Sequence, residues 1–220
     1  MNIQHPSQGG NPPHSQSGYT LLEGLMAVIV VSVMLLAIGP VISFSVGTRF
    51  QAKRVELATQ AARTYIDGVK SGAIPVPTLD SKKVNDRDAP TGGTLSCNTT
   101  TNLCNSVTDL YCVDFDGGGC LNTSPVDMVV QGLAYHPSPS QTSTTQSYVL
   151  GVRVYRANSF ASGVTLTKPT SNKSVDSLTT NSLGNRSLPL VQMSTEVLPK
   201  DARLQDHIKY RVQTPSPPSP

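Results

Sequence analysis

The chain carries, from Tyr19 to Val46, the sequence YTLLEGLMAVIVVSVMLLAIGPVISFSV. Apolar residues dominate this run, and Glu23 is its only charged residue. As a helix the run would be about 42 Å long, whereas roughly 20 residues suffice to cross a bilayer. We therefore expect residues 19–46 to form a hydrophobic helix that anchors the chain in a membrane.

The residues before this run are polar and rich in Pro, Gly, Ser and Gln, and residues 1–18 contain no Lys or Arg. A secretory signal has a basic start, a shorter apolar stretch and a small-residue cleavage site, and none of these is found here. A simple transmembrane anchor explains the length of the run but gives Glu23 no purpose. A carboxylate in hydrocarbon is costly, so it marks a function with a specific partner.

The hexapeptide Gly18-Tyr19-Thr20-Leu21-Leu22-Glu23 resembles the prepilin processing site of the type IV pilin-like proteins, which include the pseudopilins. The resemblance implies that residues 1–18 are a leader. A dedicated peptidase would cut after Gly18 and methylate the new terminus at Tyr19. It also implies that Glu23, as fifth residue of the mature chain, and Pro40, as the twenty-second, occupy the family's positions for an acid and a helix-disrupting proline.

Glu23 is expected to act in assembly. A buried charge without a partner is strongly destabilising, whereas a paired one is tolerated. The acid would therefore hold a subunit where it meets the terminal amine of a neighbour. Gly39-Pro40 removes a backbone donor and is expected to break the helix, or else to form a static kink with no role in assembly.

Basic residues lie on the far side of the apolar run, at Arg49, Lys53 and Arg54, while the leader offers only His5 and His14. The positive-inside rule alone therefore predicts an orientation with the downstream chain in the cytoplasm. The prepilin resemblance implies the opposite: a single pass through the inner (plasma) membrane, with the domain in the periplasm or outside the cell.

Residues 47–72 are expected to continue the helix as an amphipathic half. One apolar stripe has helical spacing, and glycines and prolines end it by residue 77. The stripe consists of Val55, Ala58, Ala62, Tyr65 and Val69. The stripe predicts packing on a sheet built from residues 73–212, and the tail 213–220 is expected to be disordered.

Three strands are expected, over residues 126–135, 148–156 and 188–197, with Ser/Thr-rich loops at 138–147 and 162–187. In the second strand, Leu150, Val152 and Val154 alternate with Gly151, Arg153 and Tyr155. The predicted fold class is α+β and pilin-like: a long N-terminal helix on a small antiparallel sheet with long irregular loops.

All four cysteines fall within a Cys-rich loop, 97–120, at Cys97, Cys104, Cys112 and Cys120. An exported domain meets oxidising conditions, so disulfides are expected, but the sequence leaves three pairings open. The spacings lack the Cys-x-x-Cys of a zinc site. Asp114 and Asp116, followed by Gly117, are weak calcium candidates because most ligands of a calcium loop are missing; the alternative is a solvated glycine turn.

Neither a catalytic motif nor a nucleic-acid footprint is evident. The 220 residues carry a net charge of +3, and only 14% of them are charged. His136 and His207 are isolated and are expected to be exposed rather than catalytic. We therefore expect no enzyme activity, no cofactor and no nucleic-acid partner.

Downstream, Tyr111-Cys112-Val113-Asp114 and residues 150–157, LGVRVYRA, resemble the hormogonium polysaccharide secretion pseudopilins of filamentous cyanobacteria. This resemblance implies a minor pseudopilin of a machine related to type IV pili and type II secretion, which supports polysaccharide export and gliding. The implied partners are the prepilin peptidase, other pseudopilins, an inner-membrane platform protein, an assembly ATPase and the exported polysaccharide. The alternatives are a minor pilin for adhesion or DNA uptake and a membrane-tethered carbohydrate-binding protein.

Overall fold

The computed structural model describes residues 20–105, 109–136, 143, 145–169 and 185–199. The predicted tail and most of the second Ser/Thr-rich loop lie outside these ranges. The chain divides between Ser45 and Val46 into two compact units.

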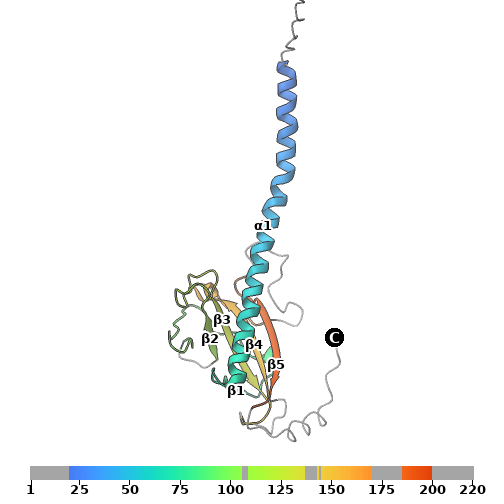
Figure 1. Ribbon diagram of the computed structural model, residues 1–220. Helices are drawn as coiled ribbons and strands as arrows, with labels where there is room; N and C mark the ends of the chain where they lie inside the picture. The colour runs from blue at the N-terminus through green and yellow to red at the C-terminus, as the bar shows by residue number, and fades with distance from the viewer. Residues whose placement is uncertain (1–19, 106–108, 137–142, 144, 170–184, 200–220) are drawn as a thin grey trace, which may run out of the picture. The chain divides into compact units, whose positions relative to one another are not determined.

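Helix α1 extends from Leu21 to Ser71, and Pro40 lies inside it without ending it (Figure 1). In the second unit, α1 buries an apolar face that confirms the predicted packing stripe. The buried apolar residues of α1 are Ala58, Ala61, Ala62, Tyr65, Ile66 and Val69, and Val55 is partly buried beside them. Gly72 directly follows the last helical residue, and its φ of 80° is readily adopted only by glycine.

The sheet has five strands: β1 Leu79–Asp80, β2 Leu110–Val113, β3 Met128–Tyr135, β4 Tyr148–Arg156 and β5 Val191–Val197. The order is β1-β3-β4-β5. One edge of β3 pairs along its length with β4, while β2 and β1 share the other edge. The three expected strands are therefore confirmed as β3, β4 and β5. However, β1 pairs parallel to β3, so the sheet is mixed rather than purely antiparallel.

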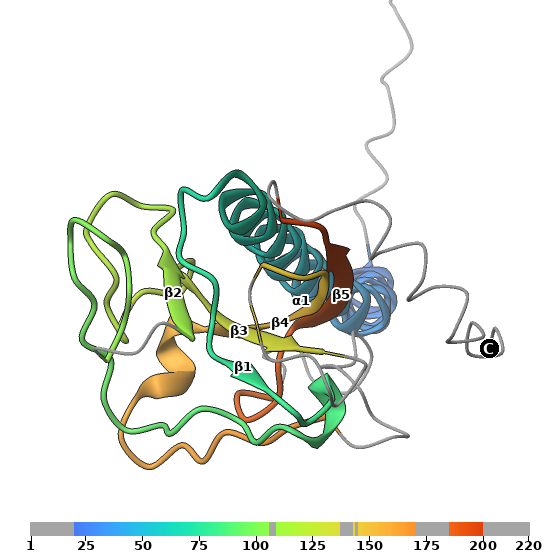
Figure 2. The same cartoon turned by 90° about the horizontal axis from the view of Figure 1, so that it is seen from below.

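Both faces of the sheet are covered. On the face that we call the helix face, Val130, Val152 and Val154 pack against α1. Figure 2 shows α1 on this side of β3 and β4 and irregular segments on the other. The alternation expected in β4 separates the two faces, but residues of both kinds are buried because neither face is left to solvent.

The opposite side, the loop face, is covered by segments with little regular structure, including the 3₁₀ helices η1 Val84–Asp86 and η2 Ala157–Phe160. Its core joins Val129 and Tyr155 to Phe160 and to the cysteines of the Cys-rich loop. Tyr155 and Phe160 meet edge to face, with ring centroids 6.4 Å apart.

Arg153 is fully buried on the loop face, where an unpaired charge would be costly. Backbone carbonyls and one side-chain amide accept its donors. Its Nε donates to Gln192 Oε1 at 3.0 Å, its Nη1 to the carbonyl of Arg87 at 3.0 Å, and its Nη2 to the carbonyl of Val84. Burial lowers the pKa of this guanidinium below its ordinary value. The side chain thus fastens η1 and the residues after it to β4.

Two glycines allow the covering segments to approach the sheet closely. A Cβ at Gly132 would lie 2.8 Å from Tyr65 Cζ on the helix face, and one at Gly151 would lie 2.9 Å from Val84 Cγ1 on the loop face. Real Cβ contacts are longer than this, so each glycine makes room for one large side chain of the covering layer.

Candidate functional site

The first part of α1 exposes a continuous apolar surface. Every large apolar side chain from Leu21 to Ile42 is at least half exposed. The hydroxyls inside the run are satisfied locally, because Ser32 Oγ donates to the Val28 carbonyl at 2.7 Å and Ser43 Oγ to the Gly39 carbonyl at 3.2 Å. By length and composition this helix could cross a membrane. Its surface calls for apolar surroundings, from lipid or from other helices.

The start of α1 is capped by its own sequence. Thr20 Oγ1 accepts the backbone N–H of Glu23 at 3.3 Å, which places the acid in the first turn. Thr-x-x-Glu is the capping-box spacing, and a negative charge near a helix N-terminus is favourable. Thr20 thus caps the helix, a role that the sequence analysis missed although the Thr-x-x-Glu spacing was the signal. Gly18 and Tyr19 lie outside the described residues.

Gly39 and Pro40 lie within α1, and the helix continues on both sides of them. Pro40 has no N–H to offer the carbonyl one turn earlier, so one intrahelical bond is missing at this point. The Ser43 hydroxyl also donates to the Gly39 carbonyl one turn before it, at 3.2 Å. The helix therefore passes through the predicted break with a local loss of hydrogen bonding.

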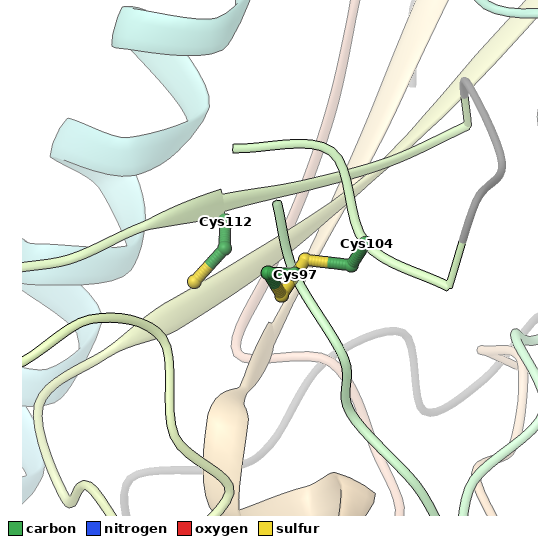
Figure 3. A group of neighbouring side chains, drawn as sticks. All are labelled: Cys97, Cys104 and Cys112. Carbon is green, nitrogen blue, oxygen red and sulfur yellow. A yellow bond between two sulfur atoms is a disulfide. The ribbon is translucent and has the colours of Figure 1, made fainter. Parts of the chain in front are cut away.

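The four cysteines form two adjacent disulfides, Cys97–Cys104 and Cys112–Cys120. The first joins two short extended segments, and the Cα atoms of its two cysteines lie 3.9 Å apart. The second connects β2 to the loop that follows it. The Sγ atoms of Cys97, Cys104 and Cys112 all lie within 4.8 Å of one another (Figure 3). The pairing that the sequence left open thus places both crosslinks at one point on the loop face.

Asp114 and Asp116 come together with a third acid, Asp127, and their carboxylate oxygens lie within 4.8 Å of one another. Asp114 accepts the N–H groups of Gly117 at 2.7 Å and Gly119 at 2.8 Å. Both glycines have φ near 80°. These bonds lower the pKa of the Asp114 carboxyl. Asp114 thus holds a glycine turn, and the weak calcium prediction for Asp114 and Asp116 stays a prediction.

Asp127 was missed because it is distant from the other two in sequence and precedes a strand. It is fully buried, and its carboxylate accepts the N–H groups of Phe115 at 3.1 Å and Leu121 at 3.4 Å. Burial raises the pKa of Asp127 above its ordinary value, and the two neighbouring acids raise it further. Clustered carboxylates are the oxygen ligands that calcium prefers, and a carboxylate that accepts backbone N–H groups keeps further lone pairs for a cation.

The expectation that His136 is exposed is wrong. The side chain is buried, with Nδ1 at 3.0 Å from the Ser147 carbonyl and Nε2 at 2.9 Å from the Ser143 carbonyl. Its ring meets Tyr148 edge-on, with the centroids 6.5 Å apart. His136 therefore connects the end of β3 to the residues that lead into β4, which is a structural role. His207 lies outside the described residues.

No protein-family model, no curated protein and no solved structure matches this chain. A long apolar N-terminal helix with a second part that packs on a small mixed sheet is an α+β arrangement, compatible with pilin-like architecture.

Proposed function

We propose that this protein is a minor pseudopilin of a secretion machine related to type IV pili and type II secretion. The supporting observation is the exposed apolar helix, which carries one acid in its first turn, five residues after Gly18. A prepilin peptidase would cut after Gly18 and methylate Tyr19. The mature subunit would wait in the inner membrane with its domain outside the cytoplasm.

Assembly in this proposal depends on Glu23. Withdrawing a carboxylate into a bundle of apolar helices is costly unless a positive charge meets it. The terminal amine of a neighbouring subunit supplies that charge, so a subunit docks where its acid finds an amine. An assembly ATPase and a platform protein would extract the subunit from the membrane into a short filament.

The secretion machine would export polysaccharide, and gliding motility would depend on this export. It rests on the resemblance of residues 111–114 and 150–157 to the hormogonium polysaccharide secretion pseudopilins. A loop face crosslinked by two disulfides suits a recognition or tip subunit, because it holds irregular segments in place for contact with a partner.

The deciding measurement is the mass of the mature N-terminus in cells. We expect a chain that begins at N-methylated Tyr19; an intact leader on the working protein would contradict the proposal. In the same cells, Glu23→Ala should reduce incorporation into filaments at least tenfold, with Glu56→Ala, an exposed acid later in α1, as the matched control. A strain that lacks this protein should secrete less polysaccharide than the wild type.

A further inference from the structure

A pair of exposed basic side chains follows the apolar part of α1. Residues 24–48 carry no charged side chain, and Arg49 and Lys53 are the first charges after Glu23. Both are exposed, and their four-residue spacing places them on one side of the helix. The next acid along the chain is Glu56. We call Arg49 and Lys53 the basic pair.

The position of the basic pair matches the thickness of a bilayer. Arg49 lies 26 residues after Glu23, which corresponds to about 39 Å along a helix. A bilayer with its headgroup layers is roughly 40–45 Å thick. When Glu23 lies in one headgroup layer of a spanning helix, the basic pair therefore lies in the other.

The surroundings of the pair are also those of an interface. Phe50, directly beside Arg49, is 62% exposed, and Val46 is 48% exposed. Long basic side chains keep their stems against apolar surface and extend their charged ends toward polar groups. This segment thus combines apolar surface for the acyl chains with cations at the level of lipid phosphates.

We propose that Arg49 and Lys53 bind the phosphate groups of anionic lipids in the leaflet on the side of the domain. The inference rests on the proposed membrane-anchored state. It accounts for basic residues that follow the apolar run although the leader has none. Lipid is favoured over an acidic protein partner because a subunit that waits in the membrane has phosphates on every side before any neighbour arrives.

The test uses the full chain in nanodiscs that contain both phosphatidylglycerol and phosphatidylcholine. Native mass spectrometry measures the ratio of the two lipids that remain bound. Each cation near an anionic surface contributes enough to change binding about fivefold, so Arg49→Gln with Lys53→Gln should lower the ratio roughly 30-fold. High salt should lower the wild-type ratio as well.

The matched control is Arg63→Gln with Lys70→Gln, which removes two exposed cations that lie about 15 Å or more beyond Lys53 along α1. This variant should keep the wild-type ratio. An equal fall in both double variants, or none in the first, would overturn the proposal. Filament loss in the first variant with an unchanged lipid ratio would assign the pair to a neighbouring subunit instead.

The outcome is separable from that of the proposed function. Glu23→Ala should impair filament assembly but leave the lipid ratio unchanged. A domain found on the cytoplasmic side by protease accessibility would contradict the pseudopilin proposal and the choice of leaflet, while the lipid ratio still tests the basic pair itself.

Discussion

The two faces of the sheet are buried to a similar degree by different means. The helix face is covered by one regular element whose small and aromatic side chains pack against valines. The loop face is covered by irregular segments that are held by two disulfides, a buried arginine and aspartates that accept backbone N–H groups. A helix satisfies its own backbone, whereas irregular chain needs side chains and crosslinks to do so. The comparison therefore predicts different weak points on the two faces.

Removing both disulfides should have the largest effect. Each closes a short loop, for which chain entropy predicts about 2.5 kcal/mol, so the four-fold Cys→Ser variant should lose about 5 kcal/mol of unfolding free energy. Urea titration of the full chain in detergent measures the loss. Hydrogen exchange should rise first on the loop face, in β2, while the buried amides of α1 remain protected. A loss below about 1 kcal/mol would mean that packing alone holds the loop face.

On the helix face, Tyr65→Ala should cost about 3–4 kcal/mol, because it empties a fully buried aromatic site next to Gly132. Among the described residues, Tyr65 Oη has no hydrogen-bond partner, and burial holds the pKa of this phenol above its ordinary value. Tyr65→Phe should therefore be nearly neutral, and Thr64→Ala, at an exposed neighbour, is the control. A large loss in Tyr65→Phe would show that the hydroxyl is bonded in solution. Thermal unfolding distinguishes these outcomes.

The smallest effect concerns Asp127 and pH. Its raised pKa means that the native state keeps a proton that the unfolded chain has lost, so this group's contribution to stability falls as pH rises above about 3.8. Asp127→Asn should remove that slope and cost about 1–2 kcal/mol at low pH through a lost acceptor.

Asp114 provides the contrast, since its lowered pKa contributes stability that is present above its ordinary pKa and lost as pH falls. Asp114→Asn should thus change the pH slope in the opposite direction. Equal slopes for the two variants in urea titrations across this pH range would contradict the assignment. A calcium-induced rise in unfolding temperature that Asp127→Asn abolishes would assign the cluster to a cation.

The helix face could be predicted from the sequence because its signals are local. The 3.6-residue stripe predicted the buried face of α1. An apolar run between two prolines predicted β3, clear alternation predicted β4, and a less regular pattern predicted β5. At the start of α1, the Thr-x-x-Glu spacing likewise indicates the cap in which Thr20 accepts the N–H of Glu23. In each case the pattern and the structure concern residues a few positions apart.

The loop face could not be predicted in the same way. Strands β1 and β2 have only two and four residues, so they exist because β3 offers them an edge rather than through their own pattern. The disulfide pairing stayed open because the separations of successive cysteines are nearly equal. Asp127 accepts the N–H of Phe115, and His136 bonds the carbonyl of Ser147. Both partners are more than ten residues away in the chain, so no local pattern indicates these bonds.

The buried guanidinium of Arg153 couples β4 to the segment around η1. This group stays protonated at any ordinary pH, so it cannot escape its low-polarity site by losing its proton. Its acceptors include the carbonyls of Val84, Arg87 and Asp88, which come 65 to 69 residues earlier in the chain. These carbonyls must be in place whenever the guanidinium is buried. Opening the segment around η1 would replace these carbonyls with water as the acceptors of Arg153, so the buried hydrogen bonds of this side chain form only when the segment lies against β4.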